Sequence, residues 1–174
     1  TELATNVDID VTSNNEILEM CLLHSIDLVI VGPEKQFEQG LTNALKEKNI
    51  LVFGPTMEAS QLEASKSFTK NMCKHKKIPT GNYEIFSRVD DAKKFLREQP
   101  TPYVIKADGL AAGKGVLVSS DIEEADNFIS SIFAGKIGTV KSKVIIEEYL
   151  EGKEMSVFFA IDKKTIKYLS LIHI

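Results

Sequence analysis

The stretch from Tyr103 to Val118, YVIKADGLAAGKGVLV, combines residue types that bind phosphate. A β-type run enters a loop with three glycines and a lysine, and a second β-type run leaves it. Glycine lets backbone N–H groups approach phosphate oxygens closely and adopt positive φ, and lysine supplies positive charge. The first question is therefore which kind of phosphate loop these residues form.

The P-loop consensus GxxxxGK[ST] does not fit this loop. Only three residues separate Gly109 from Gly113, and Gly115 stands where a P-loop has the hydroxyl residue that holds magnesium. A P-loop also opens a helix, whereas residues 116–118 are typical of a strand. The dinucleotide fingerprint GxGxxG is absent as well. What remains is a β-hairpin whose flexible tip folds over a triphosphate, with an ordinary glycine-rich turn as the alternative.

Two lysines of this segment are candidates for binding the phosphate. Lys106 lies in the strand before the tip, and a lysine in a β run is costly to bury unless an anion pairs with it. Lys114 lies in the loop itself, where a solvated side chain is an equally good explanation. We therefore predict that phosphate is bound by Lys106 in preference to Lys114.

A second group of polar residues follows the apolar run 144–146. Glu147 and Glu148 come first, and Glu154 lies in the turn before the next strand. A segment that leaves a strand with free backbone groups can hydrogen-bond an adenine edge, and a nearby carboxylate can accept ribose hydroxyls. Taken alone, such glutamates are more typical of a solvated edge. The glycine loop upstream favours a nucleotide.

The elements that position these residues begin with alternating strands and helices. Strands are predicted over 7–11, 26–31 and 50–53, and helices over 14–24 and 35–48. The run 26–31, IDLVIV, is nearly all apolar, which is typical of a strand covered on both faces of a parallel sheet. The alternation predicts a doubly wound α/β layer, in which ligands lie at the carboxyl ends of the strands. Gly32-Pro33-Glu34 and Gly54-Pro55 occupy that edge, although a Gly-Pro pair can also be a turn alone.

A long helix predicted over 58–76 leads through Ile78-Pro79-Thr80 into a second unit. The basic run 74–77 at its end suits the helix dipole and needs no nucleic acid to explain it. Asp121 and Glu124 have capping-box spacing at the start of a later helix. The pattern of this unit predicts helices over 89–98 and 122–133 and strands over 83–86, 103–107, 116–118, 144–146, 155–161 and 165–169.

Composition sets further limits. The 174 residues are 43% hydrophobic and 26% charged, with a net charge of −4, which gives no basic footprint for nucleic acid. Cys21 and Cys73 lack metal-ligand spacing, which indicates reduced thiols in the cytoplasm. No apolar run of ~20 residues and no signal peptide is present, so we expect no membrane association. The chain starts at Thr1 rather than Met and ends abruptly at residues 171–174, and we expect both ends to be cut.

Together these segments resemble the phosphoribosylamine–glycine ligases (glycinamide ribonucleotide synthetases), which are ATP-grasp enzymes of purine synthesis. IKADGLAAGKGVLV matches their glycine-loop signature almost letter for letter, and this wording is specific to them among ATP-grasp proteins. Four other segments agree in order and spacing: VGPE at 31–34, FGP at 53–55, LEASKSFTK at 62–70 and IIEEYLEGKEMSVF at 145–158. The resemblance covers about residues 5–170. After Leu169 the ending SLIHI departs from the pattern and indicates a truncation or a foreign tail.

The resemblance implies an α/β fold class in three pieces. Residues 1–62 would be the end of a doubly wound, parallel-sheet N-terminal domain, the Rossmann-like domain that precedes the ATP-grasp. Residues 63–174 would be the first part of the ATP-grasp domain, with an α+β lid subdomain at about 82–148 and then the start of the core.

The resemblance also implies the reaction. The carboxylate of glycine attacks the γ-phosphate of ATP to give glycyl phosphate, and the amine of 5-phosphoribosylamine then displaces phosphate to form an amide. The rival functions are another ATP-grasp ligase or carboxylase subunit, and a non-catalytic nucleotide-binding module. The family further implies a cytoplasmic enzyme that is a monomer or a weak dimer, or is fused to other purine enzymes in some lineages.

The residues that the family uses for ATP map onto this chain in three groups. The phosphates would be held by two lysines and the loop, adenine by the segment after residue 146, and the ribose by one glutamate. These residues are Lys66, Lys106, Asp108, Gly109, Gly113, Lys114, Gly115, Glu147, Glu148, Tyr149, Leu150 and Glu154. Gly32, Pro33 and Glu34 would line the wall near phosphoribosylamine. The family's Mg²⁺ or Mn²⁺ ligands have no counterpart in this sequence, and no residue of the chain is identified as catalytic.

Overall fold

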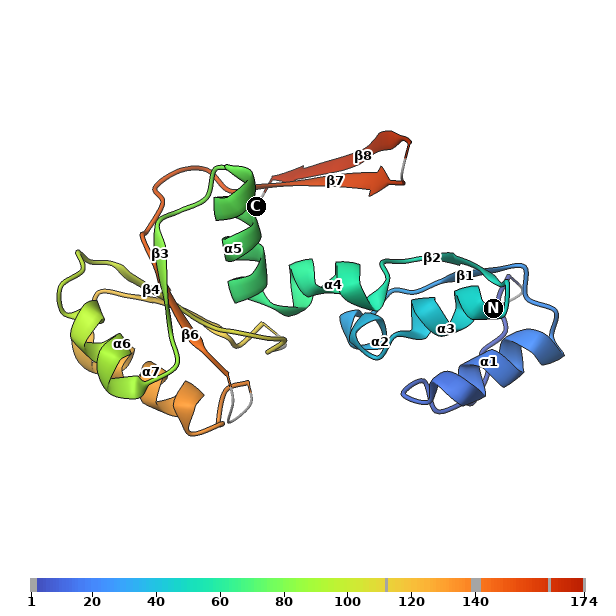
Figure 1. Ribbon diagram of the computed structural model, residues 1–174, viewed down its shortest axis with the longest axis horizontal. Coiled ribbons are helices and arrows are strands. Elements are labelled where there is room, and N and C mark those ends of the chain that lie inside the picture. Colours follow the sequence, from blue (N-terminus) through green and yellow to red (C-terminus); the bar gives the residue numbers. More distant parts are fainter. Residues whose placement is uncertain (1–2, 112, 139–141, 163, 174) are drawn as a thin grey trace.

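The structure, a computed structural model, describes residues 3–111, 113–138, 142–162 and 164–173. Ala112 of the predicted glycine loop lies outside these ranges. Three parts follow one another along the chain: an N-terminal α/β unit, a central unit built on a four-stranded sheet, and a C-terminal hairpin (Figure 1). None of the helices in the described ranges is both long enough and apolar enough to cross a membrane.

The N-terminal unit is a small parallel α/β layer. Its elements are α1 (Asn14–Leu23), β1 (Leu28–Ile30), α2 (Glu34–Glu38), α3 (Leu41–Glu47) and β2 (Leu51–Phe53). Strands β1 and β2 pair in parallel, with Val29 opposite Val52. Ser13 caps α1 by accepting a hydrogen bond from the Glu16 backbone N–H. The alternation of strands and helices confirms the α/β class.

Two expectations for this unit were wrong. Residues 7–11 form no strand, because side chains take their backbone groups: Glu16 accepts from the Asp10 N–H, and Gln36 donates to the Val11 carbonyl. The strand predicted over 26–31 is also not covered on both faces. Helices α1 and α3 lie on one side of β1 and β2 (Figure 1), and the opposite face leaves Ile30 70% exposed.

Both long helices of the prediction are broken into two. The helix predicted over 35–48 is α2 and α3, separated at Gly40, whose φ of 75° is a left-handed conformation that glycine adopts readily. The helix predicted over 58–76 is α4 (Met57–Ala64) and α5 (Lys66–Lys76). Ser65 between them is extended, with φ −131°, and caps α5 by accepting from the Phe68 N–H.

The central unit is a mixed α/β layer with antiparallel strands. Its elements are β3 (Tyr83–Phe86), α6 (Val89–Leu96), β4 (Tyr103–Ala107), β5 (Val116–Ser119), α7 (Ile122–Phe133) and β6 (Val144–Glu147), and the strand order is β3-β6-β4-β5. One face of the sheet packs on α6 and α7 through a core that includes Ile105, Ile129 and Ile146. Helix α7 begins at the predicted cap, where Asp121 accepts from the Glu124 N–H.

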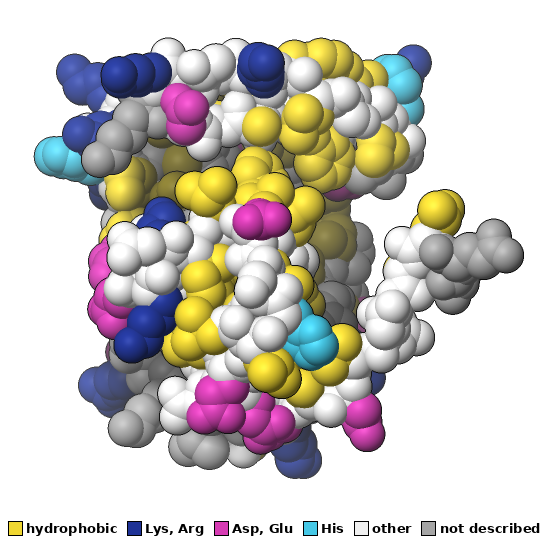
Figure 2. Space-filling model, turned by 90° about the vertical axis from the view of Figure 1, so that its right-hand side faces the viewer, with side chains coloured by type: hydrophobic (Ala, Val, Ile, Leu, Met, Phe, Trp, Pro, Cys, Tyr) yellow, Lys and Arg dark blue, Asp and Glu magenta, His cyan; other side chains and the backbone are white. Residues whose placement is uncertain are grey.

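The C-terminal part is an antiparallel hairpin of β7 (Met155–Ile161) and β8 (Ile166–His173). Strand β8 runs beyond the predicted 165–169 because residues 170–173 pair with the start of β7, with His173 opposite Met155. Large apolar side chains are exposed on both strands, among them Ile161 and Leu169. Figure 2 views the molecule from the right-hand side of Figure 1 and shows hydrophobic side chains gathered on the surface at that side.

Candidate functional site

The helix-free face of the central sheet brings together two charged residues that are distant in sequence. Side chains alternate between the faces of a strand, so Lys106 of β4 and Glu147 of β6 both point away from the helices. Lys106 Nζ lies 3.0 Å from Glu147 Oε2. The Glu147 side chain is only 8% exposed, so its charge is held in a largely desolvated place.

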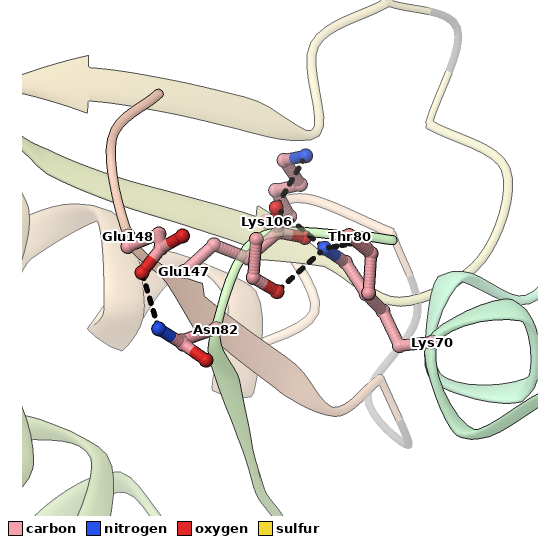
Figure 3. Close-up of polar contacts among 7 residues, drawn as sticks. Lys70, Thr80, Asn82, Lys106, Glu147 and Glu148 are labelled. Atoms are coloured by element: carbon pink, nitrogen blue, oxygen red, sulfur yellow. Dashed lines mark hydrogen bonds and ion pairs between the residues drawn. The ribbon is translucent and has the colours of Figure 1, made fainter. Parts of the chain in front are cut away.

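Helix α5 adds a third charge, Lys70, which sequence reasoning did not single out. Lys70 Nζ lies 3.0 Å from the same Oε2 atom of Glu147, and its side chain is 12% exposed. The ammonium also donates to Thr80 Oγ1 at 2.7 Å (Figure 3). The available signal was its place in LEASKSFTK, since Lys66 and Lys70 are four apart and share a face of a helix.

The other carboxylate oxygen of Glu147, Oε1, is buried and has no hydrogen-bond partner among the residues that the structure describes. A buried carboxylate oxygen without a donor is unfavourable, so this atom is available to accept a hydrogen bond from a ligand.

The glycine loop is tied at its base to the start of α5. The Asp108 carboxylate accepts from the Ser67 N–H at 3.1 Å, from both Ser65 and Ser67 hydroxyls, and from the Gly109 N–H at 3.1 Å. Lys66 Nζ donates to the Gly109 carbonyl at 3.0 Å. The Asp108 side chain thus anchors the loop to the start of α5, and Lys66 contacts the loop backbone.

The geometry of the loop requires glycine at all three of its glycine positions. Gly109 and Gly113 have φ +96° and +78°, conformations that residues with a side chain rarely adopt. Gly115 is buried, and a Cβ there would lie 2.7 Å from the Ala111 Cβ, too close for either atom to remain in place. The Gly115 carbonyl accepts from the Ala107 N–H at 2.7 Å, which holds this end of the loop on β4.

A cavity of about 930 Å³ lies between the N-terminal unit, α5, the glycine loop and the helix-free sheet face. Its volume is in the range of sites for small ligands and cofactors. The predicted site residues that line it are Pro33, Glu34, Lys66, Lys106, Gly109, Gly113, Gly115 and Glu147, together with Lys70. The predicted site residues of the described part of the chain that do not line this cavity are Gly32, Asp108, Lys114, Glu148, Tyr149, Leu150 and Glu154.

The predicted adenine segment follows directly after β6. Glu148 is fixed there, because its N–H donates to the Asn82 carbonyl at 2.9 Å and its carboxylate accepts from the Asn82 side chain (Figure 3). Tyr149 and Leu150 are 51% and 65% exposed. Glu154 is exposed just before β7.

A second cavity of about 980 Å³ is lined by Glu147, Glu148 and Tyr149 together with Tyr83. Glu147 therefore lies between the two cavities. Burial raises the pKa of the Tyr83 phenol above its usual range, and the negative charge of Glu84 adds to this, so the phenol stays neutral. Its hydroxyl donates to Asn71 Oδ1 at 3.1 Å.

The same described residues do not form a donor set for a divalent metal. Across the described ranges, no group of three His, Cys, Asp or Glu side chains is placed to hold a metal ion. Glu147 is already paired with two lysines. The cations Lys66, Lys70 and Lys106 of the lining fit an anionic ligand, whereas the described side chains form no donor set for Mg²⁺ or Mn²⁺.

Comparison with known proteins gives matches along the whole chain. Residues 1–63 match the family model of the phosphoribosylglycinamide synthetase N domain, and residues 64–173 match that of the phosphoribosylglycinamide synthetase ATP-grasp (A) domain. The phosphoribosylamine–glycine ligase of Rhizobium meliloti is 43% identical over 165 residues. That alignment covers 95% of this chain and 39% of the relative, so the chain spans about two fifths of the length of that relative.

Solved structures show the same fold. The phosphoribosylamine–glycine ligase of Thermotoga maritima superposes with a TM-score of 0.74 at 31% identity, over 88% of this chain and 38% of the other. The biotin carboxylase domain of the Hydrogenobacter thermophilus 2-oxoglutarate carboxylase, solved with MgADP, gives a TM-score of 0.73 at 22% identity. That match covers 91% of this chain and 36% of the other, and at this identity it bears on the fold alone.

Proposed function

The chain belongs to the phosphoribosylglycinamide synthetase family, and on that premise we propose that its protein joins glycine to 5-phosphoribosylamine at the expense of ATP. The products would be glycinamide ribonucleotide, ADP and phosphate, a step of purine synthesis. The observation that carries the proposal is the cavity in which Lys66, Lys70 and Lys106 meet the glycine loop. The names of the relatives agree with it.

The phosphates of ATP would be held by charge and by backbone. Lys66 and Lys106 bring positive charge to the cavity, and the loop from Asp108 to Gly115 offers N–H groups that glycine leaves accessible. Lys114 is exposed and would reach a phosphate only if the loop closed. Phosphoryl transfer needs chiefly such positioning and charge neutralisation, so these groups suit the reaction.

The base and ribose would lie along the helix-free face of the sheet. Val116 and Val118 are 45% and 52% exposed there, and they would give a planar base an apolar surface. Glu147 Oε1 would accept from a donor on the base, and the backbone of residues 148–150 would follow its edge. Glu154 would accept the ribose hydroxyls.

The second substrate would enter from the N-terminal unit. Pro33 and Glu34 line the same cavity as the lysines, which supports placing phosphoribosylamine against Gly32-Pro33-Glu34. The glycine carboxylate would attack the γ-phosphate, the P–O bond to ADP would break, and the amine of phosphoribosylamine would then displace phosphate from the glycyl carbon. ATP supplies the phosphoryl group that activates the carboxylate.

The remaining assignments follow from the family. ATP-grasp ligases use a divalent metal, for which the described residues offer no donor set. We propose a division at residues 62 and 63, with the lid at about 82–148. We further propose that the protein is cytoplasmic. It would be a monomer or a weak dimer, either on its own or fused to other purine enzymes.

The proposal is tested by measuring ADP release from the full-length protein while glycine, 5-phosphoribosylamine or ATP is left out in turn. We expect release only when all three are present, with glycinamide ribonucleotide as product. ADP release that does not require glycine but requires another carboxylate substrate would identify a different ATP-grasp enzyme. The carboxylase domain with the same fold is an example of such a rival. Nucleotide binding without any release would identify a binding module.

A further inference from the structure

We propose that Lys70 is a positioning residue that keeps Glu147 paired while Lys106 leaves this carboxylate for a nucleotide phosphate. Lys106 would thus be an exchangeable partner of Glu147, and Lys70 a permanent one. This inference rests on the proposed function, because it takes the anion in the cavity to be the phosphate of a nucleotide.

The two lysines contact the same atom but are held very differently. Both Nζ atoms lie 3.0 Å from Glu147 Oε2. Lys70 has further acceptors in Thr80 Oγ1 at 2.7 Å and the Gly81 carbonyl at 3.4 Å, and its Nζ lies 5.4 Å from the centre of the Tyr83 ring. These contacts come from the segment before β3 and from β3 itself, so Lys70 is fixed on several sides (Figure 3).

Lys106 is held by much less. Among the residues that the structure describes, Glu147 is the partner recorded for its ammonium group, and its side chain is 27% exposed against 12% for Lys70. Lys106 also lines the cavity beside Gly109 and Gly115, where a bound phosphate would compete for it. Of the two cations, Lys106 is therefore the one that an anion can draw away.

The charge balance explains why both lysines are needed. Two cations share one carboxylate, so the cluster carries one positive charge in excess, which favours binding of an anion. When Lys106 moves to a phosphate, Lys70 remains to neutralise Glu147, whose side chain is 8% exposed. Without Lys70, the same movement would leave a buried carboxylate unpaired, which is strongly unfavourable. Lys70 would thus lower the cost of phosphate binding without touching the phosphate.

A purely structural Lys70 would behave differently. If it only secured the segment around Thr80, its loss would weaken the fold and the binding of every nucleoside alike. The exchange predicts a selective effect on ligands with phosphate. The dissociation constant for adenosine divided by that for ATP isolates that effect, because adenosine shares the base and ribose but carries no phosphate.

The experiment measures this ratio by calorimetry and competition in the full-length protein. We expect Lys70→Met to lower the ratio by roughly tenfold to a hundredfold, since an unpaired buried charge is costly, while adenosine affinity stays close to that of the unmodified protein. Lys70→Arg keeps a cation on Glu147 and should retain the ratio. The matched control is Lys74→Met, which removes an exposed lysine one turn along the same helix.

A double variant gives a second, independent outcome. With Glu147→Gln there is no charge to leave unpaired, so adding Lys70→Met should change the ratio by no more than about twofold, as for uncoupled sites. The exchange requires both results, a lowered ratio when Glu147 is charged and an unchanged ratio when it is Gln, because a purely structural Lys70 leaves the ratio unchanged in both. Lys70→Gln replaces Lys70→Met in both backgrounds if Lys70→Met folds poorly.

The outcomes separate the two levels of the account. Suppose that the unmodified protein binds ATP. If Lys70→Met then leaves the ratio unchanged, or lowers it equally in the Glu147→Gln background, the exchange is overturned and the proposed function remains intact. A protein that binds adenosine and ATP equally would instead overturn the phosphate site, and with it the proposed function.

Discussion

Lys70 and Lys106 reach one oxygen of Glu147 from two different elements, α5 and β4. Lys106 was identified from the sequence because a lysine in a β run needs an anion, and the structure gives it Glu147 as that anion. Lys70 could not be identified in this way, since a second lysine on a polar helix is ordinary. Its importance depends on the approach of α5 to the end of β6, and this contact has no sequence signature.

Asp108 also has contacts that the sequence did not indicate. The family resemblance placed it in the loop that closes over ATP, yet its carboxylate is bonded to Ser65, Ser67 and Gly109. Its position directly after β4 was predictable, but its partners were not, because Ser65 lies at a helix start that the sequence pattern had merged into one long helix.

Replacing Asp108 should therefore destabilise the fold. We expect Asp108→Ala to lower the free energy of unfolding by about 1.5–3 kcal/mol, the usual effect of losing hydrogen bonds to a charged group. The control Asp91→Ala removes an exposed carboxylate 3.6 Å from Arg88 and should cost less than about 1 kcal/mol. Urea unfolding of both variants checks this, and equal losses would show that Asp108 anchors nothing.

At the scale of elements, three strands and the capped helix α7 were predicted best, whereas residues 7–11 form no strand. Strands β3, β4 and β7 have the predicted bounds, because short apolar runs between turn residues define a strand well. The helix breaks at Gly40 and Ser65 were missed, since a single glycine or serine inside a helical pattern is often tolerated. The break at Ser65 matters most, because it creates the capped start of α5 to which the glycine loop is bonded.

The loop itself offers a test at this scale. Gly115→Ala would place a Cβ 2.7 Å from the Ala111 Cβ, so the loop backbone must shift. Overpacking of this kind costs about 1–3 kcal/mol, and we expect the KM for ATP to rise roughly tenfold. Gly152→Ala is the control, because a Cβ there would meet no atom within 4 Å. Steady-state kinetics with varied ATP measure the effect, and an unchanged KM for Gly115→Ala would mean that loop geometry does not limit ATP binding.

At the scale of the whole molecule, the chain leaves much apolar surface open. Leu28 and Ile30 of β1 are 53% and 70% exposed, and the hairpin exposes Ile161 and Ile166 at 67% and 69%. The sequence predicted strands over 26–31, 155–161 and 165–169, and β1, β7 and β8 form there. What it could not indicate is how few neighbours these strands have here, because burial depends on segments that pack against them.

The separate 174-residue chain is expected to be inactive. It spans 39% of the length of its Rhizobium meliloti relative, and its described residues offer no side-chain set for the metal that the family uses. An assay of glycine-dependent ADP release on residues 1–174 alone should give only background, with the full-length protein as positive control. Turnover above background would show that this portion already contains the complete catalytic machinery.

The central claim is that the cavity under the glycine loop holds the phosphates of ATP through Lys106. Titration calorimetry of ATP into the full-length protein and its Lys106→Ala variant tests it most directly. Loss of one charge-assisted contact is worth about 1.5–3 kcal/mol, so the variant should bind ATP roughly tenfold to a hundredfold more weakly. ATP binding of unchanged affinity in a folded Lys106→Ala protein would contradict the account.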